Sequence, residues 1–255
     1  HKAIGSKLKP IFIDTGFMRL NEPENVRRAV SKPPLNLPLK IVGAKSAFMK
    51  ALDGIQNAEE KRKAFGETMY TILGDSARKE GCKYLVQGTI APDWIETKGG
   101  IKTQHNVLEQ LGIRTLEKYG FTLIEPLVSL YKDQVRQVAR FLKVGPQTSE
   151  RQPFPGPGLV VRCVGKIDQN KLQALKKATS IVERAIKDQG AQQYFAVVLE
   201  NQFEEGQLSS SIRKLAADSL SLGQDEVEVK VFRDSATGVK GDERVYGKVA
   251  GISLS

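Results

Sequence analysis

The chain has 255 residues, of which 40% are hydrophobic and 27% charged, and its formal net charge is +10 at pH 7. These proportions are typical of globular proteins, and no run approaches the roughly 20 apolar residues that a membrane-spanning helix needs. The positive charge is compatible with nucleic acid, with an anionic nucleotide substrate or with a basic surface alone. Aromatic residues make up only 7%, so the sequence shows no stacking platforms for single-stranded nucleic acid.

Two features bear on the cellular compartment and on the start of the chain. Cys82 and Cys163 are far apart and belong to no CxxC pattern, which argues against a zinc site or a disulfide framework and predicts two reduced thiols in a cytoplasmic protein. The first residues, HKAIGSKLKPIF, contain neither a signal pattern nor an initiating Met. They are typical of the tail of a helix that enters a strand, so we expect further residues upstream.

Segments typical of strands and helices alternate over the first two thirds of the chain. Short apolar runs predict strands at 11–13, 39–42, 82–88 and 122–127. Between the second and the third of these, Asn57 and Glu60 have the spacing of a helix cap, and Gly81 is suited to end the helix. Apolar residues at helical spacing predict the buried face of this helix: Phe65, Met69, Ile72 and Leu73.

A second helix is expected over 129–145, with Ser129 as its cap. Its apolar residues share one face: Tyr131, Val135, Val138 and Leu142. Strands and helices that alternate with short connections indicate an α/β fold, an open parallel sheet covered by helices. Such sheets bind ligands at the carboxyl ends of their strands, which directs attention to the loops after Ile13, Val86 and Leu127.

The stretch RQPFPGPG, residues 151–158, separates this region from a second one of different character. Its three prolines and two glycines predict a stiff, shaped crossing that is neither helix nor central strand. Beyond it we expect strands at 159–167, 195–200, 226–232 and 244–255, and helices at 170–190 and 209–222. This pattern predicts a smaller α+β unit, so we divide the chain into domains at 1–150 and 151–255.

Polar residues that could contact a bound nucleotide follow two of the expected strands. Asp14 and Thr15 end the first strand, where they could face a nucleotide or form an ordinary turn. Gly88 and Thr89 follow the third strand. A glycine there admits a phosphate close to the backbone, and the threonine hydroxyl can donate to it.

Charged residues gather in further loops. Asp93 and Glu96 carry hard oxygen ligands suited to Mg²⁺, although acids in the first turn of a helix also suit its dipole. In KGGIKTQHN, paired glycines beside Lys102 suggest a mobile lid that folds over phosphates, whereas a lone loop histidine such as His105 is more often a solvated residue than a catalyst.

Two more charged stretches have a functional and a structural interpretation. EEKRKAFGE, which contains Arg62, has the pattern of a solvated helix face. GVKGDERVYG is a glycine-punctuated turn that displays Asp242 and Arg244. The guanidinium could grip a phosphate through two hydrogen bonds, or the turn could be a hairpin with surface charge.

The chain resembles GMP synthase in eight motifs that occur in the family's order: IDTGFMR, EEKRKAFGE, QGTIAPDWIE, GGIKTQHN, LIEPL, YKDQVR, RQPFPGPGLVVR and GVKGDERVYG. The likeness is to the ATP-pyrophosphatase and dimerisation parts of that family and covers nearly all of 1–199 and 234–255. It implies an adenine-nucleotide α-hydrolase-like parallel sheet with helices on both faces, followed by a smaller α+β dimerisation domain. RQPFPGPG would then be the bridge between the two, beside the substrate nucleotide.

The resemblance also implies an activity, that of a ligase of purine biosynthesis that uses ATP and Mg²⁺. In this family the O2 of xanthosine monophosphate (XMP) is adenylated with release of pyrophosphate, and ammonia then displaces AMP to give GMP. Lys102 matches the family's lid lysine, which is expected to stabilise charge on the reacting phosphates. The matched positions are Asp14, Thr15, Gly16, Phe17, Gly88 and Thr89 for ATP, Asp93 and Glu96 for the metal, Lys102 and His105 for catalysis, and Arg62, Asp242 and Arg244 for XMP.

The sequence departs from the family pattern in several places. The phosphate-binding loop, SGGVDSS, would lie just before HKAIG, and a tail like KPPGTIEWE would follow Ser255. Without them the resemblance implies a truncated chain that we do not expect to be active by itself. The lid has Gln104 where the family usually has His, so a role that needs paired histidines does not carry over.

The arrangement of subunits is also implied by the resemblance. No glutaminase domain is attached, and 200–232 is longer than in the common bacterial form. This resembles the archaeal two-subunit type, a homodimer that receives ammonia from a separate glutaminase subunit and has no nucleic-acid or membrane partner.

Two alternatives stay open. Another ATP-pyrophosphatase, such as NAD synthetase or a tRNA-modifying thiolase, would share the sheet but should lack RQPFPGPG and GVKGDERVYG. A non-enzymatic basic scaffold would fit the charge of +10 and should bind generic nucleic acid tightly and in a salt-sensitive manner.

Overall fold

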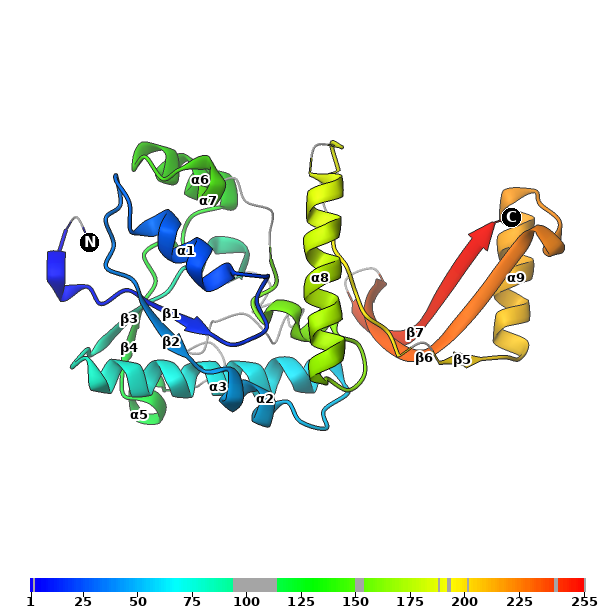
Figure 1. Ribbon diagram of the computed structural model, residues 1–255, viewed down its shortest axis with the longest axis horizontal. Helices are drawn as coiled ribbons and strands as arrows, with labels where there is room; N and C mark the ends of the chain where they lie inside the picture. Colours follow the sequence, from blue (N-terminus) through cyan, green and yellow to red (C-terminus); the bar gives the residue numbers. More distant parts are fainter. Residues whose placement is uncertain are drawn as a thin grey trace.

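The computed structural model describes residues 1, 3–93, 114–149, 154–187, 189–191, 194–200, 202–240 and 243–254. Within them the fold is mixed α/β, with parallel strand pairs, covering helices and a C-terminal hairpin (Figure 1). No helix in this part of the chain is long and apolar enough to cross a membrane.

Two pairs of parallel strands form the first part of the fold. β1 (Ile11–Asp14) pairs with β2 (Lys40–Gly43), and β3 (Tyr84–Val86) pairs with β4 (Thr122–Ile124). The four strands expected in the first two thirds of the chain are therefore confirmed. Among the described residues they form two two-stranded sheets, where the alternation of elements predicted one continuous sheet.

The helix α3 (Ala58–Lys79) begins and ends where local sequence rules place it. The Asn57 side chain accepts hydrogen bonds from the backbone N–H groups of Glu59 and Glu60, at 2.8 and 3.2 Å. Gly81, just beyond the helix, has a φ of +65°, a conformation that glycine adopts without strain. The expected cap and stop signals are thus confirmed.

The same helix contributes to two hydrophobic clusters. Phe65 packs with Phe48 and Ile13 in the larger cluster, which contacts β1 and the helix after β2. One turn further on, Tyr70 packs with Tyr119. Among the described residues, no strand of one pair is hydrogen-bonded to a strand of the other pair. Because α3 supplies residues to both clusters, this helix joins the two strand pairs.

Shorter helices complete this part. They are η1 (Gly5–Lys7), α1 (Glu22–Val30), α2 (Lys45–Ala51), α5 (Thr115–Tyr119), α6 (Lys132–Phe141) and α7 (Pro146–Ser149). The expected cap of α6 at Ser129 is wrong: the helix begins after Tyr131, whose N–H donates to the Gln134 side chain at 2.8 Å. That bond satisfies an amide at the helix start, so the helix begins two residues later than predicted.

The run after the proline-glycine crossing is a 3₁₀ helix and not the expected strand. Residues Gly158–Arg162 form η2, which begins at Gly158 with a φ of +62°. The Leu159 N–H donates to the carbonyl of Phe17 at 2.8 Å, so the segment is attached to the turn that follows β1. The strand expected at 195–200 is reduced to one bridge, between Cys163 and Val198.

The larger hydrophobic cluster continues across residue 150. Leu159 from η2 and Leu175 from α8 (Gln169–Ile186) are fully buried together with Phe17 and Phe48. The amphipathic helix expected at 170–190 is thus confirmed, with Asp168 as its cap. In Figure 1, α8 stands beside the strand pairs, between them and the hairpin. The division into 1–150 and 151–255 stays a prediction.

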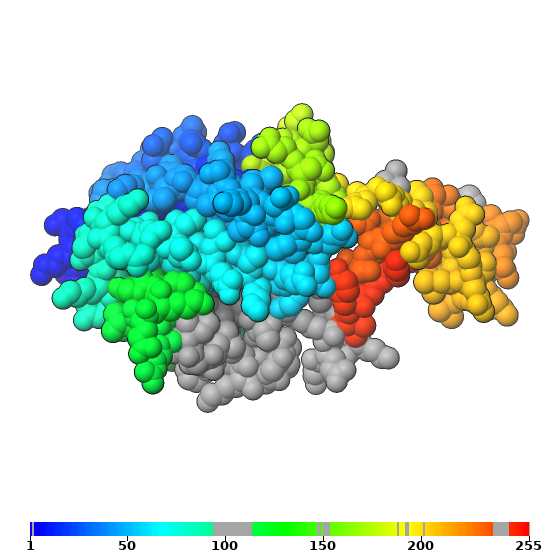
Figure 2. Space-filling view, turned by 90° about the horizontal axis from the view of Figure 1, so that it is seen from below, coloured from blue at the N-terminus to red at the C-terminus, as the bar shows by residue number. Residues whose placement is uncertain are grey.

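The C-terminal part is a long antiparallel hairpin with one helix. β6 (Val227–Lys240) pairs with β7 (Glu243–Leu254) and with the short β5 (Phe203–Glu204). Helix α9 (Gln207–Leu220), followed by η3 (Gln224–Glu226), packs on β6 through a small cluster of its own: Ala217, Val227, Val229 and Val231. Figure 2 shows this part extending away from the main body. The expected helix and both strands are confirmed.

Two glycines of α3 give a matched test of this packing. A Cβ added to Gly74 would lie 2.5 Å from the carbonyl oxygen of Tyr119, whereas one added to Gly66 would meet no atom within 4 Å. Gly74→Ala should therefore lower the free energy of unfolding by about 1–3 kcal/mol. Gly66→Ala should raise it by roughly 0.5–1 kcal/mol, because alanine restricts the unfolded chain. Urea denaturation of both variants checks this, and a stabilising Gly74→Ala would contradict the close approach.

Candidate active site

The residues at the carboxyl end of β1 form a compact, hydrogen-bonded turn. One carboxylate oxygen of Asp14 accepts from the N–H of Gly16 at 3.0 Å, and the other lies 3.1 Å from the ammonium of Lys45. Thr15 is fully buried, and its hydroxyl accepts from the N–H of Phe17 at 3.1 Å. The ring of Phe17 is also fully buried, in the main core. A ligand at this end of β1 would thus meet backbone groups and the Asp14–Lys45 pair.

A second polar set lies where β3 and β4 end side by side. Thr89 is buried, and its hydroxyl donates to the carboxylate of Glu125, the residue directly after β4. The side chain of Gln87 donates to the Thr89 hydroxyl and accepts from the hydroxyl of Tyr70, both at 3.1 Å. Burial raises the pKa of Tyr70 well above its usual value, so this hydroxyl stays protonated. Gly88 lies in the middle of this chain of contacts, with open space at its Cβ position.

Sequence reasoning missed three members of this set, Glu125, Gln87 and Tyr70. A signal was available for the first two, because each directly follows a strand, where polar side chains of a parallel sheet gather. Tyr70 carries no such signal, since it lies in the middle of α3 on the apolar face. It becomes a polar partner only because β3 ends against that helix.

Among the proposed metal ligands the structure describes only Asp93, whose carboxylate accepts from the N–H of Ile90 at 3.0 Å. Within the described part of the chain, no three His, Cys, Asp or Glu side chains are grouped to hold a metal ion. Glu96, Lys102, Gln104, His105 and Asp242 lie outside the described residues. Arg244 lies in β7, paired in register with Val239.

The charged start of α3 is solvent-exposed at Glu59, Glu60 and Lys63, as its sequence pattern predicts, but Lys61 is an exception. Lys61 is only 1% exposed, and its ammonium donates to the carbonyls of Cys163 at 2.7 Å and Gly165 at 2.5 Å. Arg62 is the next residue, with a side chain 19% exposed and 3.3 Å from the carboxylate of Glu59. The helix therefore places one cation inside the protein and the next near its surface.

A second lysine binds the same turn from the other side. The ammonium of Lys171, on α8, donates to the carbonyl of Val164 and, at 3.3 Å, to that of Lys166. Lys61 and Lys171 together thus bind four consecutive carbonyls, those of residues 163–166. Burial is the main cause that lowers the pKa of Lys61 to about 8, and the nearby charge of Lys171 lowers it further.

The turn is linked onward to the hairpin. Gly165 has a φ of +71°, and a Cβ there would lie 2.3 Å from a carboxylate oxygen of Glu200. The same carboxylate accepts from the N–H of Lys166 at 3.0 Å, and the N–H of Glu200 donates to Asp234 at 2.8 Å. Asp234 is a buried residue of β6. A continuous series of contacts therefore runs from α3 to the hairpin.

Curated relatives are similar over the whole chain. A subunit of the glutamine-hydrolyzing GMP synthase of Sulfurisphaera tokodaii is 46% identical over 253 residues, 99% of this chain and 64% of the relative. The corresponding subunits of Methanopyrus kandleri and Archaeoglobus fulgidus are 41% and 40% identical, and the matches cover 71% and 69% of their lengths. The chain thus spans slightly under two thirds of the first of these relatives. No protein-family model matches it.

The buried ammonium of Lys61 predicts a pH dependence. Its folded-state pKa of about 8 lies below the usual value of 10.5, so between these values the unfolded chain binds more protons and stability rises with pH. The free energy of unfolding of the wild type, minus that of Lys61→Met, should therefore increase from pH 8 to pH 10.5 and be constant below pH 7. Urea denaturation across this range measures it. A difference that is flat or falls with pH would show that burial does not disfavour the charged amine.

Proposed function

Because the chain belongs to this family of GMP synthase subunits, we propose that it is part of the subunit that converts XMP to GMP. The observation that carries this proposal is identity of 40–46% to such subunits over 99–100% of the chain. The eight motifs that resemble the family lie within the same stretch. The activity is assigned to the full-length protein, since the chain spans only part of its relatives.

The proposed reaction has two steps. The O2 of XMP attacks the α-phosphorus of ATP, the bond to the β-phosphate oxygen breaks, and pyrophosphate leaves. Ammonia then attacks C2 of the adenylated purine, AMP leaves with the O2 oxygen, and a proton is lost to give GMP. The relatives are each named as one subunit of a glutamine-hydrolyzing enzyme, which supports a separate glutaminase subunit as the source of ammonia.

Residues at the strand ends are proposed to hold ATP. Asp14, Thr15, Gly16 and Phe17 would contact the adenine mainly through backbone groups, because the side chains of Thr15 and Phe17 are buried. Gly88 would admit a phosphate, in keeping with the open space at its Cβ position. Thr89 would position the loop, since its hydroxyl already binds Glu125. This is the arrangement expected of an adenine-nucleotide α-hydrolase-like sheet.

The remaining assignments follow the family resemblance. Lys102 and His105 are proposed to stabilise charge on the reacting phosphates, and Arg62, Asp242 and Arg244 to bind XMP. Carboxylate oxygens fit Mg²⁺, which in nucleotide sites takes one or two carboxylates together with substrate phosphates, so Asp93 and Glu96 would hold this ion. When bound, Mg²⁺ would neutralise part of the charge on the phosphates of ATP.

A homodimer in the cytoplasm is proposed from the hairpin and from the family. Val227 and Val229 of β6 are buried under α9, whereas their register partners on β7, Leu254 and Ile252, are 55% and 51% exposed. Register partners point to the same face of a sheet, so α9 covers only part of an apolar surface. A second copy of the chain could cover the rest.

Other interpretations are less well supported. NAD synthetase or a tRNA-modifying enzyme is not favoured, because the relatives named above are all GMP synthase subunits. A basic nucleic-acid-binding scaffold is not favoured either, because the same relatives are named as subunits of an enzyme.

Pyrophosphate release by the full-length protein tests the proposal. With Mg·ATP and ammonium present, release should require XMP and should be accompanied by equimolar GMP. Sedimentation of the same preparation at micromolar concentration should give the mass of a dimer. Pyrophosphate release that does not depend on XMP would contradict the proposed activity. A monomeric mass would contradict the proposed dimer.

A further inference from the structure

Arg162, at the end of η2, is a largely buried residue, and its guanidinium makes no hydrogen bond within the described part of the chain. Arg162 is 8% exposed, and its contacts there are with aromatic rings: its Cζ lies 5.1 Å from the ring centre of Phe154 and 4.7 Å from that of Phe195. A guanidinium carries five N–H donors in its plane. The nitrogens of Arg162 are not among the side-chain atoms that are both buried and unpaired in the described part of the chain, so these donors remain open to a ligand.

The aromatic rings account for the position of the guanidinium but not for its donors. A cation is attracted to the face of an aromatic ring by the charge distribution of that ring, and this contact supplies no hydrogen-bond acceptor of the usual kind. The N–H groups point outward from the edge of the guanidinium, in the geometry that matches a carboxylate or phosphate. The rings therefore hold the fork in place while its donors remain available to an oxyanion.

A second arginine strengthens the positive potential. The Cζ of Arg19 lies 4.0 Å from the centre of the same Phe154 ring, and its Nε is 2.5 Å from the carboxylate of Glu183 on α8. Two guanidinium groups and one carboxylate leave a net charge of +1. Burial is the main cause that lowers the pKa of Arg162; the charge of Arg19 also lowers it, and that of Glu183 raises it.

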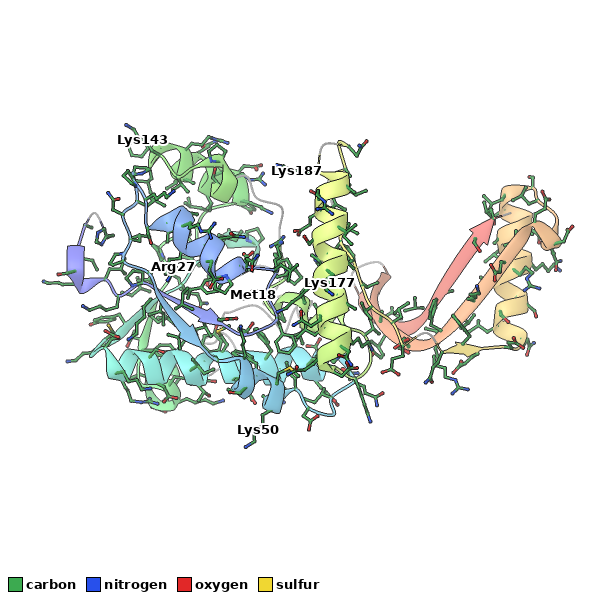
Figure 3. The ribbon with its side chains drawn as sticks, viewed as in Figure 1. Met18, Arg27, Lys50, Lys143, Lys177 and Lys187 are labelled. Carbon is green, nitrogen blue, oxygen red and sulfur yellow. The ribbon has the colours of Figure 1, made fainter. Side chains whose placement is uncertain are left out.

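The cluster lies next to the proposed ATP-binding turn. Arg19 follows Phe17 by two residues, and the N–H of Leu159 binds the Phe17 carbonyl at 2.8 Å. Gly158 permits this approach, since a Cβ there would lie 2.3 Å from the same carbonyl oxygen. Figure 3 marks the neighbouring segments by Met18, between β1 and α1, and Lys177 on α8.

We propose that Arg162, assisted by Arg19, binds the phosphate group of a nucleoside monophosphate. The doubly charged phosphate matches a site with two guanidinium groups and one carboxylate, and its oxygens would accept the donors of Arg162. The identification of the phosphate as part of a nucleotide substrate rests on the proposed function. The binding of phosphate by Arg162 is argued independently of that function.

Isothermal titration of the full-length protein tests this, with inorganic phosphate, AMP and XMP as ligands and adenosine and xanthosine as phosphate-free controls. Arg162→Gln should weaken binding of each phosphate-bearing ligand that uses the site by about tenfold or more, since a charge-assisted pair is lost. Arg162→Lys, which keeps the charge but loses the planar fork, should weaken it less. Arg184→Gln, an exposed arginine of α8, is the matched control and should change nothing.

Glu183→Gln should change the phosphate affinity in the opposite direction to Arg162→Gln. This second variant keeps the proposal testable if Arg162→Gln does not fold. Removal of the carboxylate raises the positive potential, so phosphate should bind about two- to fivefold more tightly at low salt. A purely structural role for the cluster predicts lower thermal stability with unchanged affinity. Unchanged phosphate affinity in folded Arg162→Gln, or unchanged or weaker affinity in Glu183→Gln, would overturn the proposal. Arg162-dependent binding of inorganic phosphate without XMP-dependent pyrophosphate release would instead refute only the proposed function.

Discussion

The buried ammonium of Lys61 connects the two halves of this fold. It lies on the first turn of α3 and binds the carbonyls of Cys163 and Gly165, about one hundred residues away. Transfer of an ammonium out of water is costly unless hydrogen bonds replace its hydration. The two carbonyls replace the lost hydration. The turn at 163–166 is therefore held in a fixed position relative to α3. Lys171 fixes the same turn to α8.

The same hydrogen bonds link the residues that are proposed to bind XMP. Arg62 is the neighbour of Lys61, and the turn that Lys61 binds leads through Glu200 to Asp234 in β6. Arg244, another proposed XMP ligand, lies in β7, the strand that pairs with β6. One set of hydrogen bonds therefore ties the helix that carries Arg62 to the hairpin that carries Arg244. The proposed phosphate site at Arg162 lies one residue before the same turn.

Local patterns predicted the elements that depend on local physics. β1 and α3 were predictable because an apolar run, an Asn57 cap and a stop at Gly81 act within a few residues. The segment 159–167 was not, because a short apolar run is compatible with a strand or a buried helix. Its 3₁₀ form depends on the positive φ of Gly158 and on a hydrogen bond to Phe17, which is distant in sequence.

The positions of the proposed site residues in the fold were predictable in part. Asp14, Gly88 and Thr89 lie at strand ends, as the parallel pattern requires. The role of Lys61 was hidden, because its neighbours suggest a solvated helix face and its acceptors come from a turn that the sequence assigns to a strand. Glu125 was recognisable in principle as the residue after β4, but its bond to Thr89 depends on the register between β3 and β4.

Native-state hydrogen exchange in Lys61→Met tests the central role of this ammonium most directly. The amides of Val164, Val198 and Glu200 donate to Val198, Arg162 and Asp234 respectively, so they report on the turn and its link to β6. If Lys61 holds that link, these amides should exchange about tenfold or more faster in the variant, while the amides of β1 and β2 keep their protection. Equal acceleration of all these amides, or none, would contradict the account.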